Sequence, residues 1–165
     1  MESQAAEKAA QKFLKTGNLQ GYESNELALA CDRLVQQAAR RSIKRALTIA
    51  HRFAASAEVH GGVLALTAYR ALARVTHMGG AHADALSAYR KARHLAGRDR
   101  LVSARIDRAL IDVYMYLGRF KDSERAARRA MAAFRSLNSP NDLAQTRVNY
   151  GNLLHRQDRH REAEQ

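Results

Sequence analysis

The feature that constrains this chain most is a turn signal that recurs nearly every 40 residues. Gly80, Gly118 and Asp158 stand 38 and 40 residues apart. A small residue follows each turn by five positions and a large residue precedes each by eight; the small residues are Ala85, Ser123 and Ala163, and the large ones are Leu72, Leu110 and Tyr150. Self-similarity at such a period is typical of stacked supersecondary units. We therefore expect a repeat architecture in which small side chains let neighbouring helices approach closely.

Between the turns, apolar residues recur at intervals of three and four, as in Ile106, Leu110, Val113 and Leu117. This spacing places one apolar stripe on a helix. Aromatic residues make up only 6% of the chain, which argues against sheets. The pattern predicts an all-α fold of about nine helices, near residues 2–15, 24–38, 41–59, 63–77, 82–96, 99–117, 120–137, 141–157 and 159 to the end.

The sharpest single boundary is the segment from Ser139 to Asp142. Serine can cap a helix, and proline suits the first helical position because its missing N–H would have no partner there. The carboxylate of Asp142 favours the positive end of a helix dipole. A helix is therefore predicted to begin at this point, with Ser139 as its cap.

Residues 149–154 read Asn-Tyr-Gly-Asn-Leu-Leu, and residues 158–164 read Asp-Arg-His-Arg-Glu-Ala-Glu. This pair of motifs resembles the tetratricopeptide repeat, and residues 69–92 and 104–138 supply further copies. The spacing near 40 is similar to that of the long-repeat subclass of kinesin light chains and of bacterial tetratricopeptide proteins that carry a CHAT domain. The resemblance implies a right-handed α-solenoid of antiparallel helical hairpins. Two residues depart from the pattern: Ile111 stands where a small residue is expected, and Ser123 replaces alanine.

The resemblance also suggests how the chain is organised. We expect an N-terminal helix and linker over residues 1–23, a degenerate hairpin over 24–59, and repeats over 63–165, the last of them truncated. The chain ends six residues after a helix should begin, without the polar capping helix that a solenoid needs for solubility. We therefore expect a fragment of a longer protein, with any catalytic activity in a domain downstream.

In this family the first helix of each pair lines the concave side, so the resemblance implies a peptide groove there. Asparagine carries both a donor and an acceptor and can bind the backbone of an extended peptide, while arginine can bind carboxylates with two hydrogen bonds. Asn149 and Asn152 match the family's groove asparagines. Polar side chains on a solvated helix face are the alternative interpretation. The predicted groove residues are Arg70, Arg74, Arg105, Arg108, Asp112, Gln145, Asn149 and Asn152.

The charge balance bears on the partner. There are 28 lysines and arginines against 16 acidic residues, a formal net charge of +12. Such a field attracts acidic protein segments, nucleic acid or anionic lipid. Basic clusters such as residues 90–100 keep phosphate binding open as an alternative, although charges on a solvated helix face explain them as well.

Nothing in the sequence indicates catalysis, a cofactor or a metal. No two of the seven histidines have the i, i+4 spacing of a helical zinc motif, and His77 and His82 straddle a Gly-Gly turn without cysteine or carboxylate support. Cys31 is expected to be a small core residue. No apolar stretch is long enough to cross a bilayer, so we expect a cytoplasmic protein that does not enter a membrane.

The sequence therefore favours a module for protein–protein interaction, an adaptor or sensor that binds an extended, acidic segment of another protein or of a downstream domain of the same polypeptide. A nucleic-acid-binding helical repeat is the first alternative. A self-association scaffold, in which an uncapped terminal helix pairs two chains as a homodimer, is the second.

Overall fold

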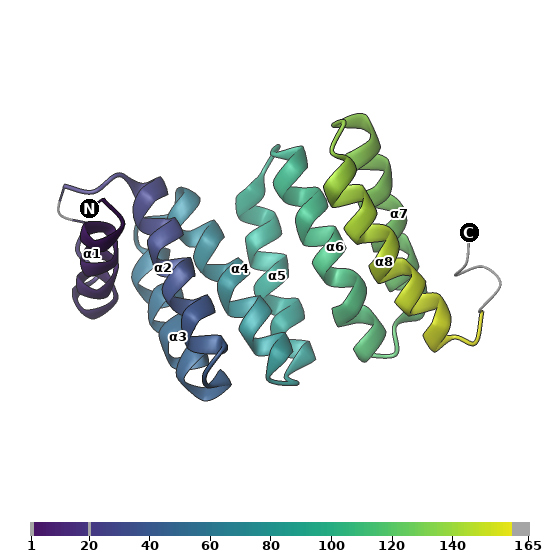
Figure 1. Ribbon diagram of the computed structural model, residues 1–165, viewed down its shortest axis with the longest axis horizontal. Helices are drawn as coiled ribbons and strands as arrows, with labels where there is room; N and C mark the ends of the chain where they lie inside the picture. Colours follow the sequence, from purple (N-terminus) through teal and green to yellow (C-terminus); the bar gives the residue numbers. More distant parts are fainter. Residues whose placement is uncertain (1, 20, 160–165) are drawn as a thin grey trace. The chain divides into compact units, whose positions relative to one another are not determined.

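The computed structural model describes residues 2–19 and 21–159, with side chains from residue 4 onward. The described residues form helices and connecting turns, without strands. Eight of the nine predicted helices are confirmed; the ninth, from 159 to the end, lies almost wholly outside the described residues. The helices are α1 (Glu2–Thr16), α2 (Ser24–Ala39), α3 (Ile43–Glu58), α4 (Gly62–Met78), α5 (His82–Ala96), α6 (Arg100–Tyr116), α7 (Phe120–Ser136) and α8 (Pro140–Arg156) (Figure 1).

The chain divides into two compact units, residues 1–95 and 96–165. In the first unit, α2 packs against α1, α3 and α4, and α3 also packs against α1 and α4. In the second unit, α6, α7 and α8 each pack against the other two. Alternate helices, α2 with α4 and α6 with α8, therefore lie side by side within their units, as expected for first helices of successive hairpins. Among the described helices, none is long and apolar enough to cross a membrane.

The same turn ends α4, α6 and α8. Gly80, Gly118 and Asp158 all adopt the left-handed conformation, with φ of 85°, 69° and 57°. In each case the N–H of the next residue donates to the carbonyl oxygen five positions earlier, which is the longer bond of the Schellman motif: the acceptors are Thr76, Tyr114 and Leu154. The recurring turn predicted from the sequence is thus confirmed as one repeated helix termination.

The two residues that depart from the family pattern contact each other where α6 packs against α7. Ser123 is fully buried, and its Oγ donates a hydrogen bond to the carbonyl oxygen of Ile111 at 2.7 Å. A buried hydroxyl without a partner would destabilise the fold, so this bond makes serine acceptable where alanine is usual. Ala85, the equivalent small residue on α5, is also fully buried, and Ala163 lies outside the described residues.

The start of α8 differs in one detail from the prediction. Pro140 is the first helical residue, as expected, but the Ser139 side chain caps no backbone N–H. Its Oγ donates instead to Oδ2 of Asp142 at 3.0 Å. Ser139 therefore occupies the N-cap position, as predicted, but its side chain makes no capping hydrogen bond, because its hydroxyl is oriented toward the Asp142 carboxylate.

Each unit has its own apolar core. In the second unit the fully buried Phe134 packs with Ala104 and Ala130, and Leu101 and Leu143 close over them. In the first unit Phe13 and Phe53 are almost fully buried. Removing the area of one such phenylalanine from water contributes about 1.5–3 kcal/mol.

Candidate functional site

Six of the eight predicted groove residues lie on the two adjacent helices α6 and α8. We call this set the α6–α8 face; it comprises Arg105, Arg108 and Asp112 on α6 and Gln145, Asn149 and Asn152 on α8. The packing of α6 against α8 in the second unit brings the two helices of this face together.

The centre of this face is Asp142, in the first turn of α8. Arg105 donates from Nε and Nη2 to Asp142 Oδ2, at 3.2 and 3.0 Å, and Arg108 donates from Nη1 to Oδ1 at 2.6 Å. Ser139 adds a further hydrogen bond to Oδ2. The Asp142 side chain is only 10% exposed, whereas Arg105 and Arg108 are 40% and 22% exposed. One carboxylate thus holds two partly exposed guanidinium groups in fixed positions.

Two opposing effects set the pKa of Asp142. Burial alone would raise it, but the hydrogen bonds from Arg105 and Ser139, the charge of Arg105 and the hydrogen bond from Arg108 together lower it below the ordinary value. The carboxylate is therefore ionised at neutral pH. Because a guanidinium has five N–H donors, Arg105 and Arg108 both keep donors that Asp142 does not use.

Farther along the same helices, Asn149 approaches Asp112. The Nδ2 of Asn149 donates to Asp112 Oδ2 across a long 3.5 Å contact. Burial raises the pKa of Asp112 above its ordinary value. Gln145 and Asn152 are exposed on α8. Met115, farther along α6, is buried and belongs to the core.

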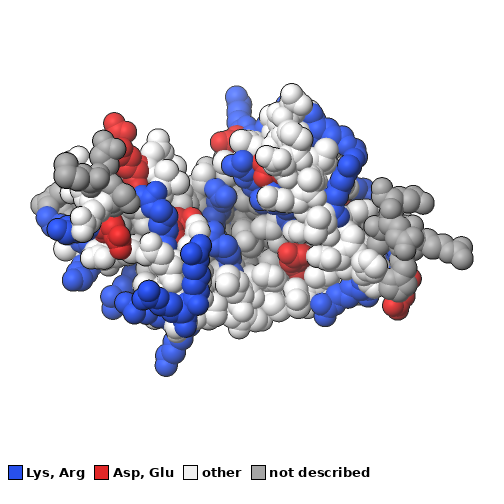
Figure 2. Space-filling view, in the orientation of Figure 1, with Lys and Arg blue, Asp and Glu red and all other residues white. Residues whose placement is uncertain are grey.

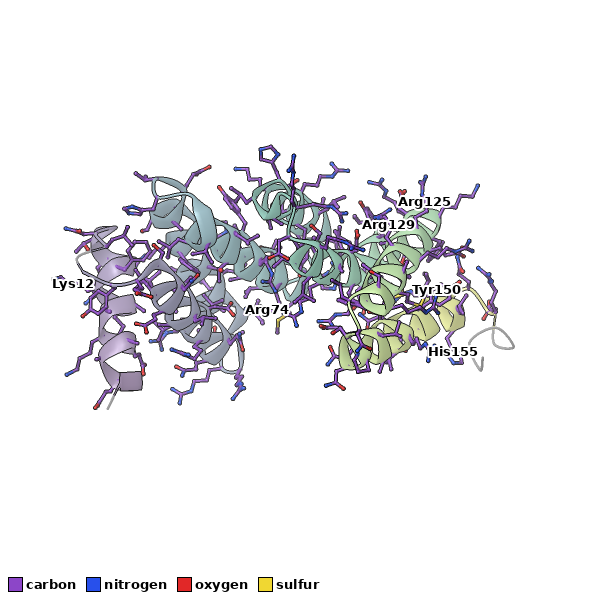
Figure 3. The ribbon with its side chains drawn as sticks, turned by 90° about the horizontal axis from the view of Figure 1, so that it is seen from above. Lys12, Arg74, Arg125, Arg129, Tyr150 and His155 are labelled. Carbon is purple, nitrogen blue, oxygen red and sulfur yellow. The ribbon has the colours of Figure 1, made fainter. Side chains whose placement is uncertain are left out.

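The other two predicted residues, Arg70 and Arg74, lie on α4 in the first unit. Figure 3 labels Arg74 on α4. Its Nη2 donates to Asp32 Oδ1 at 2.6 Å and so ties α4 to α2. Asp32 also accepts from Gln36 through its other oxygen. Arg70 is half-buried. This tie resembles the one between α6 and α8, since in both an arginine meets an aspartate on the neighbouring first helix.

The sequence interpretation missed the acidic partners of these arginines. Asp32 precedes Arg74 by 42 residues, and Asp142 follows Arg105 by 37. The sequence does contain a signal for these pairs, namely an arginine and an aspartate about one repeat apart on first helices. Such opposite charges are brought together when the two helices pack. The separations differ by five residues, however, so the period alone could not identify the pairs.

The α7 helix is also rich in ion pairs. Arg129 donates from Nη2 to Oδ1 of the buried Asp107 on α6, at 2.8 Å. Asp122 accepts from Arg119 and Arg125, and the hydrogen bond from Arg119 is the largest of the effects that lower the pKa of Asp122. Figure 3 shows Arg125 and Arg129 on α7. The arginines of this helix are thus largely engaged within the protein.

The histidine pair and the cysteine do not form a reactive site. His77 and His82 place their Nδ1 atoms 3.0 Å apart. Burial, and secondarily His82, lower the pKa of His77. Cys31 is buried as predicted, and burial raises its pKa to about 12, which keeps the thiol protonated at neutral pH. Over the described residues, no cluster of three or more histidine, cysteine or acidic side chains could hold a metal ion.

We compared the chain with protein-family models and with known proteins. Residues 102–165 match the family model of the tetratricopeptide repeat. No curated protein matches the chain significantly in sequence.

Solved structures match over almost the whole chain. BtubC (BKLC) from P. vanneervenii is similar with a TM-score of 0.73 at 19% identity, covering 99% of this chain and 69% of that one. The nearly identical TPR-like repeats of a putative kinesin light chain from Podosopora anserina match with a TM-score of 0.63 at 11% identity, covering 99% and 90%. A point variant of those repeats gives a TM-score of 0.66 at the same identity. Residues 102–165 therefore carry tetratricopeptide repeats, and the chain has the long-repeat tetratricopeptide fold of the kinesin light chain type.

Proposed function

We propose that the chain is a protein-interaction module, an adaptor or sensor, whose α6–α8 face binds an extended and acidic segment of another protein or of the same polypeptide. Tetratricopeptide repeats generally mediate protein–protein interaction. The observation that carries the proposal is the arrangement of Arg105 and Arg108 around Asp142. It supplies partly exposed cationic donors next to a helix with exposed amide side chains.

The hydrogen bonds to Asp142 favour peptide binding by Arg105 and Arg108, because they restrict the two side chains beforehand. A free arginine loses rotamer entropy when it binds, whereas Arg105 and Arg108 have already lost much of that freedom in their bonds to Asp142. Their remaining N–H groups can bind a ligand carboxylate without a large rearrangement. The electrostatic cost is that Asp142 neutralises part of the positive charge. We therefore expect moderate affinity with a strong dependence on geometry.

In this proposal Asn149 and Asn152 form hydrogen bonds with the backbone of the bound peptide. The long contact between Asn149 and Asp112 is weak and leaves the carbonyl oxygen of the Asn149 amide able to accept from a peptide N–H. Asn152 lies about one turn farther along α8 and is exposed. Contacts to peptide backbone favour an extended segment over a folded surface.

We propose a second set of contacts of the same kind on α4, from Arg70 and Arg74. Residues 24–59 are proposed to form a degenerate repeat, which the hairpin of α2 and α3 supports. The protonated Cys31 thiol and the fold, which is typically non-catalytic, support a role in binding without catalysis. A single buried cysteine suits the cytoplasm, where we place the protein.

The test is binding of a fluorescently labelled peptide of alternating glutamate and serine, followed by anisotropy. Arg105→Gln and Asn149→Ala should each weaken binding by about tenfold, because each removes hydrogen bonds to the peptide. Those of Arg105 come from a charged donor, and those of Asn149 from a neutral amide. Arg135→Gln is the matched control, since it removes one exposed arginine from the end of α7. Equal losses in Arg105→Gln and Arg135→Gln would mean that net charge alone attracts the peptide and would refute the proposed site.

A further inference from the structure

The most one-sided charge in the chain lies outside the α6–α8 face. Residues 33–57 contain six arginines and lysines and no aspartate or glutamate. We call these six cations the basic segment: Arg33, Arg40, Arg41, Lys44, Arg45 and Arg52. None of them forms an ion pair with a carboxylate of the described chain. Figure 2 shows basic side chains gathered at the lower left, over the ends of α2 and α3 that meet at their connecting turn.

Three of these cations line one cavity. Arg40, Arg41 and Arg45 border a hollow of about 330 Å³ where α2 and α3 meet α1. Leu34 and Ile49 supply apolar lining, both of them half-buried, and Gln37 supplies an amide. Glu7 on α1 is the one carboxylate among the lining residues. The hollow therefore combines an excess of positive charge with an apolar wall.

The position of the cations on α3 adds a second observation. The first turn of α3 holds Lys44 and Arg45 and no acidic residue. Cations are unfavourable there, because the N-terminus of a helix carries the positive end of its dipole. The first turns of α5, α7 and α8 each contain an aspartate, whereas those of α4 and α6, like that of α3, contain no acidic residue. A bound anion would offset both the mutual repulsion of the cations and their repulsion by the dipole.

We propose that this hollow binds a phosphorylated side chain within a segment of another protein. A phosphate group carries about −1.5 to −2 charges at neutral pH, and its three oxygens match the forked donors of several arginines around one point. Leu34 and Ile49 would contact an apolar side chain next to the phosphorylated residue. The Gln37 amide would form a hydrogen bond with the peptide backbone. The lining residues include no aromatic ring on which a nucleic-acid base could stack, so the hollow suits a peptide better than a single strand.

This site is independent of the α6–α8 face and of the function proposed for it. The test uses the whole chain and an oriented peptide library with a fixed phosphoserine between degenerate positions, beside the same library with serine. We expect binding of the phosphorylated library only, with enrichment of leucine, isoleucine or valine next to the phosphoserine. Arg40→Gln with Arg45→Gln should weaken binding of the best phosphopeptide by about tenfold or more.

Arg33→Gln with Arg52→Gln is the matched control, because it removes two cations from the same two helices outside the 330 Å³ hollow. It should change affinity by less than about twofold at physiological salt, where exposed charges are screened. Equal losses in both double variants, or equal binding of the two libraries, would overturn the proposal. So would a generic single-stranded oligonucleotide that binds more tightly and displaces the phosphopeptide. Arg105→Gln should leave phosphopeptide binding unchanged, so this test does not depend on the α6–α8 face.

Discussion

Residues 119–136 and residues 33–57 each contain six lysines and arginines. The two regions differ in how many of these cations pair with a carboxylate. In residues 119–136, four of the six pair with a carboxylate: Arg119, Arg125, Arg128 and Arg129. In residues 33–57, the basic segment has no acidic residue of its own and no ion pair with the described chain. The same number of cations therefore serves mainly internal contacts in one region and remains available in the other.

This difference shows why a net charge of +12 is a poor guide to where a partner binds. An arginine that is held by a buried aspartate contributes little to the field outside the protein, whereas clustered cations without acids dominate it. The α6–α8 face lies between these extremes, since Arg105 and Arg108 share one carboxylate and remain partly exposed. Each kind of cation should respond differently to substitution.

The largest expected effect is that of Asp107→Asn. The Asp107 side chain is 4% exposed and accepts two hydrogen bonds from Arg129. The change should lower the free energy of unfolding by about 2–3 kcal/mol, because hydrogen bonds to charged groups are lost from a buried site. Urea denaturation measures this. Asp84→Asn, at an exposed aspartate on α5, is the control and should cost less than about 1 kcal/mol.

A matched pair of arginine substitutions compares the two regions directly. Arg129→Gln should lower the free energy of unfolding by about 1–2 kcal/mol, because the buried Asp107 loses two hydrogen bonds from a charged donor. Arg45→Gln should raise the free energy of unfolding by up to about 0.3–1 kcal/mol, because it removes a cation from the first turn of α3. Thermal and urea denaturation of both variants decide the matter. A larger cost for Arg45→Gln would show that the basic segment has internal partners after all.

Acid should weaken the second unit through Asp142. Its pKa is lowered in the folded state, so its contribution to stability is present in full above the unfolded value of about 3.9 and is lost as the pH falls through the lower folded value. The free energy of unfolding, measured by urea from pH 7 to pH 2, should therefore fall below about pH 4. Asp142→Asn should flatten this fall. An unchanged slope would mean that other carboxylates cause it.

The smallest effect is expected where ion pairs are exposed. The Arg128 side chain is 70% exposed and lies 3.6 Å from Glu124. Arg128→Gln should change the free energy of unfolding by less than about 0.5 kcal/mol, and added salt should remove the difference, because surface pairs contribute little. Denaturation at low and high salt tests this. A cost near that of Arg129→Gln would indicate that the α7 pairs act as one network.

Much of the fold was predictable from the sequence because most of the helices carry two kinds of signal. The apolar stripe indicates the helix, and glycine, asparagine or proline marks its ends, as Gly118 and Pro140 do here. The recurrence of the left-handed turn then gave the repeat. The role of Ser139 was not predictable, because it depends on the orientation of the Asp142 side chain, which Arg105 and Arg108 of α6 hold.

The candidate site was predictable only in part. The resemblance named Arg105 and Arg108 as groove residues on the first helix of a hairpin, and the structure brings both of them to Asp142 on α8. The resemblance could not show which arginines pair internally, because that depends on the register between helices about one repeat apart.

The most direct measurement of the proposed peptide binding is a titration of the ¹⁵N-labelled chain with the glutamate–serine peptide, followed by two-dimensional NMR. Our account predicts saturable shifts of the side-chain amide signals of Asn149 and Asn152 and of the Nε–H signal of Arg105, which persist at physiological salt. Weak shifts spread over exposed arginines throughout the chain, and lost on adding salt, would contradict it.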